Sequence, residues 1–196
     1  MPTSPADAPA ALPLILAFGD SLTAGYGLAP HEAFPARLEA LLRDEAPGAR
    51  VINAGVSGDT TTSALARLSR LLSRLEQRPD LAVVELGAND LIRGIPPDRT
   101  ARNLDAILRE FTRCAIPVLI ASIDPPALLG ALGAGYAGIH ARLGALHGMP
   151  VHPFFPPGVL GHRDHVLRDR LHPNALAIRR VAEAMLPAVR AALRAT

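Results

Sequence analysis

Five short apolar runs alternate with longer amphipathic stretches along this chain, and this alternation limits the possible fold more than any other feature of the sequence. Near-continuous apolar runs are typical of strands covered on both faces, and the stretches between them are typical of helices that cover a sheet. The runs are Leu12–Phe18, Arg50–Asn53, Leu81–Leu86, Pro117–Ile123 and Met149–Phe155. This pattern predicts an α/β protein with a five-stranded parallel sheet between two helical layers.

Apolar side chains between the runs recur at helical spacing. They form stripes at Phe34, Leu38, Leu41 and Leu42; at Leu65, Leu68, Leu71, Leu72 and Leu75; at Leu104, Ile107, Leu108 and Phe111; at Ile139, Leu143 and Leu146; and at Ile178, Val181, Met185, Leu186 and Val189. We expect Pro187 to interrupt the last helix. The alternation favours a flavodoxin-like, three-layer α/β/α fold with strand order 2-1-3-4-5. No linker or repeat divides the chain, so we expect a single domain over residues 11–196 after a disordered tail at residues 1–10.

Composition argues against several classes of partner. The formal net charge is +2, and the basic residues are all arginines, scattered along the chain without a block of like charge. With aromatic residues at 4% and no tryptophan, we expect no nucleic-acid binding. No apolar segment reaches the ~18 residues of a membrane span, so we expect no stable membrane insertion. Residues 1–9 lack the basic start of a secretory signal, which leaves a cytoplasmic protein or a secreted or periplasmic one with its signal removed. The sequence does not indicate an oligomeric state.

Small, polar and nucleophilic residues follow four of the predicted strands. They lie in the segments 19–23, 53–60, 87–90 and 169–174, the last on the way to the final helix. In open α/β sheets, ligands bind at the carboxyl ends of the strands. Although these segments are far apart in sequence, we expect them to build one site.

The same four segments carry the resemblance of this chain to a known family. They read Phe-Gly-Asp-Ser-Leu-Thr-Ala-Gly-Tyr-Gly at 18–27, Asn-Ala-Gly-Val-Ser-Gly-Asp-Thr-Thr at 53–61, Glu-Leu-Gly-Ala-Asn-Asp at 85–90 and His-Pro-Asn at 172–174. They resemble the four blocks of the SGNH hydrolases, or GDSL esterases, in the same order. Within that superfamily the chain is most similar to the bacterial multifunctional thioesterase/arylesterase/lysophospholipase branch.

The resemblance implies that Ser21 is the nucleophile of a serine hydrolase. A serine hydroxyl attacks an ester only when a base takes its proton. Ser57 is a weaker candidate, because Gly55-Val56-Ser57-Gly58 only approximates the Gly-x-Ser-x-Gly motif of larger hydrolases. We expect the neighbouring Asp20 to hydrogen-bond backbone amides of the turn instead of orienting the base.

His172 is the predicted base among seven histidines. Pro173 suits a first helical turn, which places His172 at the rim of the site, and Asp169 lies three residues earlier to orient the imidazole. His162 and His165 are the closest competitors, and Asp164 is the alternative acid. We expect His31, His140, His147 and His152 to be surface or packing residues. The ligands for a zinc site are lacking, and no cofactor is expected.

The oxyanion of a tetrahedral intermediate needs hydrogen-bond donors aimed at it. The resemblance assigns this role to the backbone amides of Ser21 and Gly58 and to the side-chain amide of Asn89. The simpler interpretation is that Gly58 only makes a turn and Asn89 only caps a helix. Asp59 and Asp90 are expected to cap the helices that follow them.

Two departures from the family pattern bear on the substrate. Arg170 stands where relatives usually have glycine, and we expect it to point to solvent or to line the cleft entrance, where it would attract anionic acyl groups. Residues 124–138 replace a Pro-Pro-Asn-Tyr-Gly pattern with an apolar, glycine-rich segment, which fits either a mobile lid or a helix start.

The predicted reaction is acyl transfer through an acyl-enzyme on Ser21, with short- to medium-chain esters or thioesters as substrates. One alternative is a carbohydrate acetylesterase with the same triad. The other is a flavodoxin-like binding module without catalysis.

Overall fold

The computed structural model describes residues 12–125 and 130–195. The elements run in the order β1 (Leu14–Gly19), α1 (Ser21–Ala24), η2 (Pro30–Glu32), α2 (Phe34–Arg43), β2 (Arg50–Gly55), α3 (Thr61–Leu72), β3 (Leu81–Glu85), α4 (Ala88–Ile92), α5 (Pro97–Arg113), β4 (Val118–Ser122), α6 (Gly130–Ala134), α7 (Ile139–His147), β5 (Val151–Pro153), η4 (Arg163–His165) and α8 (Ala175–Arg194). The predicted tail at residues 1–10 lies outside the described residues.

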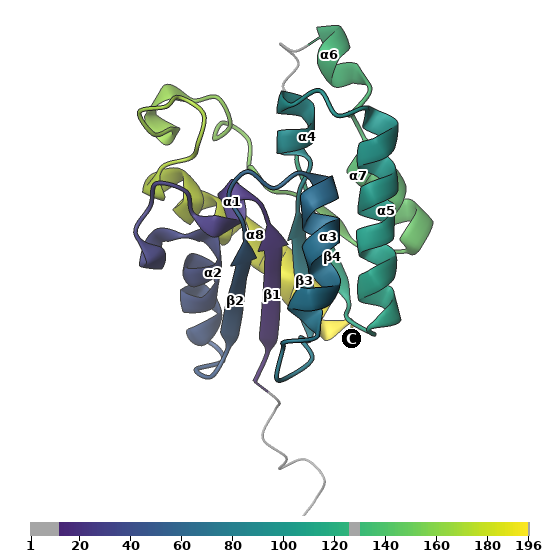
Figure 1. The fold of residues 1–196 in the computed structure, drawn as a ribbon. Helices are drawn as coiled ribbons and strands as arrows, with labels where there is room; N and C mark the ends of the chain where they lie inside the picture. Colours follow the sequence, from purple (N-terminus) through teal and green to yellow (C-terminus); the bar gives the residue numbers. More distant parts are fainter. Residues whose placement is uncertain (1–11, 126–129, 196) are drawn as a thin grey trace, which may run out of the picture.

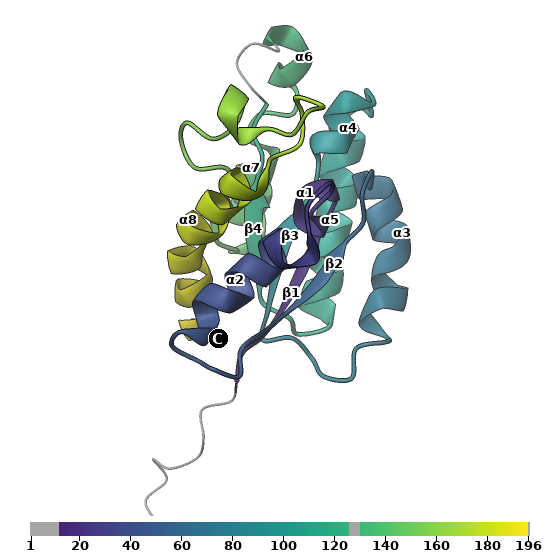
Figure 2. The same ribbon diagram turned by 90° about the vertical axis from the view of Figure 1, so that its left-hand side faces the viewer.

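The five strands form one parallel sheet in the order β2-β1-β3-β4-β5, which confirms the predicted fold and strand order. Helices α2 and α8 cover one face, and α3, α5 and α7 cover the other. Figure 1 shows the sheet with its helices, and Figure 2 shows the two helical layers on either side of it.

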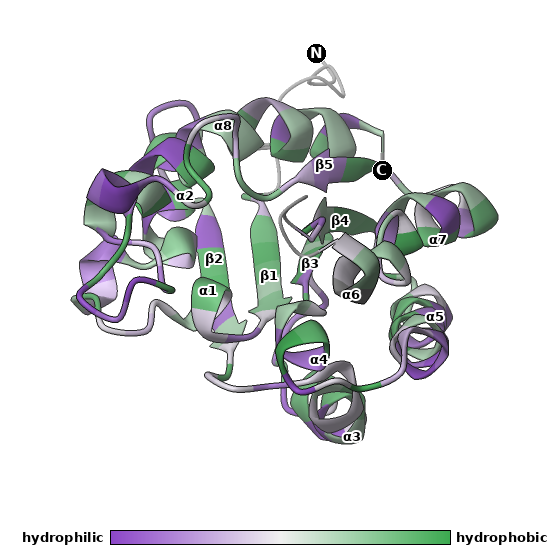
Figure 3. Cartoon of the chain, turned by 90° about the horizontal axis from the view of Figure 1, so that it is seen from above, coloured by the Kyte–Doolittle hydropathy of each residue, from purple (hydrophilic) through white to green (hydrophobic). Residues whose placement is uncertain are grey.

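Alternate residues of each strand enter opposite cores, as the pleat requires. In β1, Ile15 and Ala17 pack beneath α2 and α8, whereas Leu16 and Phe18 pack beneath α3 and α5. All of these positions are almost fully buried, and β1 is accordingly coloured as apolar in Figure 3. The central strands therefore have the continuous apolar sequence expected of strands covered on both faces.

Three local predictions differ from the structure. Helix α8 continues through Pro187, since Met185 and Val189 are fully buried on either side of it and hold the helix against the sheet. The predicted strand at 149–155 shortens to β5, an edge strand whose Pro153 has no N–H for a further ladder bond. Leu146 is exposed, unlike Ile139 and Leu143, so only part of the α7 stripe is buried.

The loops at the carboxyl ends of the strands gather at one end of the molecule (Figure 1). Helices α1 and α4 begin there, directly after β1 and β3. The sheet register puts Gly19 of β1 between Gly55 of β2 and Glu85 of β3, so three of the four sequence blocks meet at neighbouring strand ends.

Candidate active site

Ser21 is the first residue of the short helix α1, which begins directly after β1. Asp20 caps this helix, because its Oδ1 accepts the Leu22 N–H at 2.9 Å, as expected from the sequence. The helix ends after one turn at Gly25, whose φ of 83° is a left-handed conformation that glycine adopts without steric cost. This short turn fixes the Ser21 hydroxyl at the carboxyl edge of the sheet.

The structure brings Ser21 to His172, although 151 positions separate them in sequence. The distance from Ser21 Oγ to His172 Nε2 is 3.0 Å, and that from His172 Nδ1 to Asp169 Oδ2 is 2.7 Å. A carboxylate only accepts hydrogen bonds, so Nδ1 carries the ring proton and Nε2 accepts the Ser21 hydroxyl. This hydrogen-bonded chain has the geometry of an activated nucleophile.

Asp169 is held in its ionised form by its own loop. Its Oδ1 accepts the N–H groups of Leu171 at 2.9 Å and His172 at 3.0 Å. The hydrogen bond from the Leu171 amide, followed by those from the His172 ring and amide, lowers the pKa of Asp169 to about 2. The same turn thus presents the acid and the imidazole together.

The competing residues lie elsewhere. Asp164 is exposed and lies near the side chains of His162 and Arg163, whereas the carboxylate that contacts His172 belongs to Asp169. His165 is buried, and its ring packs 4.8 Å from that of His162. Among the described residues, no group of three or more histidine, cysteine, aspartate or glutamate side chains is arranged to hold a metal ion.

The three predicted oxyanion donors line one cavity. Within the described part of the chain, the backbone N–H groups of Ser21 and Gly58 have no protein acceptor, and Gly58 has a left-handed φ of 83°. Asn89 donates one side-chain N–H to Asp20 Oδ2 at 2.9 Å, which leaves its second N–H for a ligand. Asn89 is the second residue of α4, so it does not cap that helix.

Two buried acids lie behind the serine. Burial raises the pKa of Asp20 to about 6, although hydrogen bonds from Leu22 and Asn89 oppose the shift. Glu85 is fully buried at the end of β3, and its Oε2 accepts the Thr23 hydroxyl at 2.8 Å. Burial, reinforced by the nearby charge of Asp20, raises the pKa of Glu85 well above its ordinary value. These acids anchor both ends of the Ser21 turn.

The cavity beside Ser21 has a volume of about 720 Å³, which is within the usual size range of small-molecule sites. Its wall is mostly apolar, and the contributing side chains include Leu91, Ile123, Ile139, Phe155, Leu160 and Leu171. Its polar lining includes Ser21, Asn89 and His172 as well as Thr100, Asp124, Tyr136 and His140. The cavity therefore suits an apolar group whose reactive end lies at the serine.

Two cavity residues were not assigned to the site from sequence. His140 was expected to be a surface or packing residue. It is buried in the cavity wall, 2.9 Å from the Leu86 carbonyl oxygen that follows β3. Burial lowers its pKa and so favours a neutral ring. Tyr26 packs its ring on His172, with the centroids 4.4 Å apart. Tyr26 belongs to the first sequence block, which was the available signal for it.

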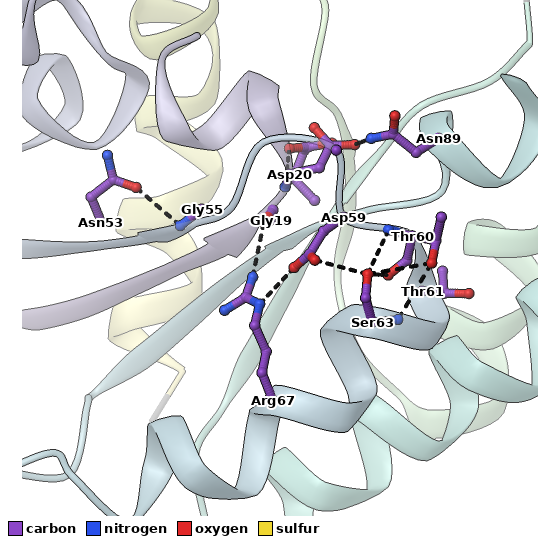
Figure 4. A network of polar contacts seen from close by, with 12 residues as sticks. Gly19, Asp20, Asn53, Gly55, Asp59, Thr60, Thr61, Ser63, Arg67 and Asn89 are labelled. Carbon is purple, nitrogen blue, oxygen red and sulfur yellow. Dashed lines mark hydrogen bonds and ion pairs between the residues drawn. The ribbon is translucent and has the colours of Figure 1, made fainter. Parts of the chain in front are cut away.

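The expected cap roles of two aspartates are wrong. Thr60 is the N-cap of α3, and Asp59 instead contacts Ser63 Oγ and Arg67 Nε (Figure 4). Asp90 lies within α4, where it accepts the Thr61 N–H at 2.8 Å from the first residue of α3. Both carboxylates therefore connect neighbouring elements and do not cap the helix that follows them.

The two departures from the family pattern are also located by the structure. Arg170 is exposed and has a left-handed φ of 59°, a conformation that glycine adopts more readily. In the segment 124–138, residues 126–129 lie outside the described part, and α6 follows them. Tyr136 donates a hydrogen bond to the Ile95 carbonyl and lines the cavity, so the end of this segment is held at the site.

Comparisons with known proteins agree with this geometry. The model of the GDSL-like lipase/acylhydrolase family matches residues 17–180, which include the strand-end blocks. The chain belongs to this family. It is 34% identical to esterase TesA of Pseudomonas aeruginosa over 182 residues, covering 92% of this chain and 90% of that protein. It is also 34% identical to thioesterase 1/protease 1/lysophospholipase L1 of Escherichia coli K12, covering 84% of this chain and 77% of that protein.

Solved structures extend the likeness to three dimensions. AlinE4, an esterase of the SGNH hydrolase family, superposes with a TM-score of 0.76 at 43% identity over 93% of this chain and 97% of that one. This acylhydrolase is therefore a carboxylic ester hydrolase, as the sequence predicted. In the described part of the acylhydrolase, no helix is long and apolar enough to cross a membrane.

Proposed function

We propose that this acylhydrolase cleaves short- to medium-chain acyl esters or thioesters through an acyl-enzyme on Ser21. The observation that carries the proposal is the continuous hydrogen-bonded chain from Ser21 through His172 to Asp169. Its two contacts have the distances that proton transfer from a serine requires.

In the first step, Ser21 Oγ attacks the carbonyl carbon while His172 Nε2 takes the hydroxyl proton. Asp169 stabilises the imidazolium that forms, and the donors of Ser21, Gly58 and Asn89 hold the oxyanion. The carbon–oxygen or carbon–sulfur bond then breaks, and His172 returns the proton to the leaving alkoxide or thiolate. A water molecule, deprotonated by His172, then attacks the acyl-enzyme in the same way and releases the acid.

The apolar cavity favours an acyl chain over a sugar. Leu91, Ile139 and Leu171 offer a sugar no hydrogen-bonding groups, whereas each buried methylene of an acyl chain contributes about 0.8 kcal/mol. We expect kcat/KM on p-nitrophenyl esters to rise by up to about fourfold per methylene from acetate until the cavity is filled. Higher activity on acetylated sugars than on these esters would favour the carbohydrate acetylesterase instead.

Labelling with a fluorophosphonate tests the nucleophile. We expect the phosphonyl group on the peptide that contains Ser21 and expect Ser21→Ala to lose both labelling and esterase activity. Ser57→Ala is a matched control, because Ser57 lines the same cavity. A folded Ser21→Ala protein that still hydrolyses esters would contradict the proposal, as would a wild-type protein labelled at another residue.

A further inference from the structure

The three proposed oxyanion donors lie on three separate segments of the chain. Ser21 follows β1, Gly58 lies between β2 and α3, and Asn89 lies in α4. Donors accelerate acyl transfer only when they are already aimed at the developing charge, and a misplacement of about 1 Å can cost on the order of a hundredfold. The contacts that fix these segments relative to one another therefore matter to the rate.

Polar contacts connect the three segments in a closed ring. The first connection is the 2.9 Å hydrogen bond from Asn89 Nδ2 to Asp20 Oδ2, which joins α4 to the Ser21 turn. The second runs from Arg93 Nη2 to the Gly58 carbonyl oxygen at 2.8 Å and joins α4 to the Gly58 loop. Asn89 and Arg93 are four residues apart and lie on one side of the same helical turn.

Arg67 of α3 makes the third connection. Its Nε lies 2.5 Å from Asp59 Oδ2, and its Nη2 donates to the Gly19 carbonyl oxygen at 3.1 Å. The guanidinium also lies 4.4 Å from the centroid of the Phe18 ring, which restricts its orientation. Figure 4 shows Arg67 reaching both Asp59 and Gly19, and Asp20 reaching Asn89.

We propose that Arg67 and Arg93 are positioning residues that align the oxyanion hole by closing this ring of contacts. The ring consists of the contacts Asp20–Asn89, Arg93–Gly58 and Arg67–Asp59/Gly19. Neither arginine is assigned a step in the acyl transfer, and the inference rests on the proposed function for the roles of Ser21, Gly58 and Asn89. Two connections meet at the Gly58–Asp59 loop, and the proposal requires both of them to keep the Gly58 amide aligned.

Arg93 offers the cleaner test because its side chain is exposed and its loss removes little packing. On p-nitrophenyl butyrate, a neutral ester, we expect Arg93→Gln to lower kcat about tenfold with KM within about twofold, since the donors act mainly in the transition state. A trifluoromethyl ketone, which forms a tetrahedral oxyanion on the serine, should bind more weakly by the same factor. Arg93→Lys should recover part of the loss, because an ammonium can also donate to the Gly58 carbonyl.

Arg99→Gln removes another exposed arginine, from α5, and serves as the charge control. Unchanged kcat in Arg93→Gln would overturn the inference, and so would a change confined to KM. Thermal unfolding of each variant separates a general loss of stability from a loss of alignment. If Ser21→Ala keeps its activity, the proposed function itself is wrong. If Ser21→Ala is inactive but Arg93→Gln is unimpaired, only the positioning role of the ring of contacts is wrong.

Arg67 is half-buried, so Arg67→Lys is preferred to a neutral variant, which would leave Asp59 without its ion pair. We expect Arg67→Lys to lower kcat, because an ammonium group does not reproduce the two simultaneous contacts that the guanidinium makes with Asp59 and Gly19. Combined with Arg93→Gln, its effect should be less than multiplicative, since both contacts restrain one loop. Fully multiplicative effects would contradict the shared role.

Discussion

The ring of Tyr26 packs on the imidazole of His172, with the two centroids 4.4 Å apart and the planes tilted by 36°. Tyr26 follows the helix that carries Ser21, and its backbone N–H donates to the Ser21 carbonyl oxygen at 3.1 Å. One short stretch of chain thus holds both the proposed nucleophile and an aromatic surface for the proposed base.

We expect Tyr26→Leu to lower kcat on p-nitrophenyl acetate by about three- to tenfold, because aromatic packing contributes about 0.5–1.5 kcal/mol. Tyr26→Phe should keep the wild-type kcat, since the ring remains. If Tyr26 acts only as cavity wall, Tyr26→Leu will change KM for longer acyl chains and leave kcat on the acetate unchanged. Steady-state kinetics on both esters separates the two roles.

Glu85→Gln is expected to change how stability depends on pH. A carboxyl group whose pKa is higher in the folded than in the unfolded protein contributes stability below the unfolded value of about 4.3. That contribution is lost as the pH rises toward the folded pKa. Glutamine has no proton to lose. The free energy of unfolding of Glu85→Gln, measured relative to that of the wild type, should therefore increase as the pH rises from about 5 to about 8.

Urea unfolding at several pH values measures this gap. Glu183→Gln, which changes an exposed glutamate of α8, is the control and should show no comparable trend. A gap between Glu85→Gln and the wild type that stays constant over this pH range would show that Glu85 titrates alike in the folded and unfolded protein.

Gly58→Ala should impair catalysis more than it impairs folding. At a φ of 83° an alanine is strained by about 1 kcal/mol, and its Cβ would lie 3.2 Å from Arg93 Nη2. We expect kcat to fall about ten- to a hundredfold as the Gly58 amide is displaced. Gly94→Ala is the matched control, because Gly94 also has a left-handed φ but has no atom within 4 Å of the added Cβ.

The two glycine variants should therefore unfold at similar urea concentrations, with only Gly58→Ala slow in catalysis. Equal kcat in the two would contradict the predicted displacement of the Gly58 amide.

Replacing Arg170 separates a backbone effect from a charge effect. We expect Arg170→Gly to be about 1 kcal/mol more stable than Arg170→Ala, because glycine tolerates the φ of 59°. If the charge attracts anionic acyl groups, both variants should lose the same preference for anionic over neutral esters. Thermal unfolding and paired kcat/KM measurements give the two answers. If Arg168→Ala loses as much of the preference for anionic esters, the preference comes from the overall positive charge near the site and not from Arg170 itself.

The sequence predicts the central part of the fold well because burial on both faces leaves a simple pattern. Strands β3 and β4 lie within the predicted apolar runs, and β1 extends one residue beyond its run, to Gly19. The strand order follows from the alternation of strands and helices. The edges are less predictable. At β5 the prolines limit the ladder, and at Pro187 tertiary packing of α8 outweighs the local tendency of proline to break a helix.

The same contrast holds in the candidate site. The strand-end rule brings Ser21 and His172 to one edge, because it depends on topology alone. The contacts of Arg67 and Arg93 depend on side-chain conformations across three loops, which no local pattern encodes. His140 enters the cavity wall for a similar reason, since the position of α7 against β3 decides which of its faces meets the site.

The 151 positions between Ser21 and His172 have a consequence for when this protein becomes chemically active. During synthesis the proposed nucleophile emerges early, but it lacks its proposed base until the segment before α8 has been made and has brought His172 to Ser21. Under the proposed function, a nascent or partly refolded chain is then inert towards the esters around it. Recovery of hydrolysis after dilution from denaturant would report the closure of the last element and not the collapse of the sheet.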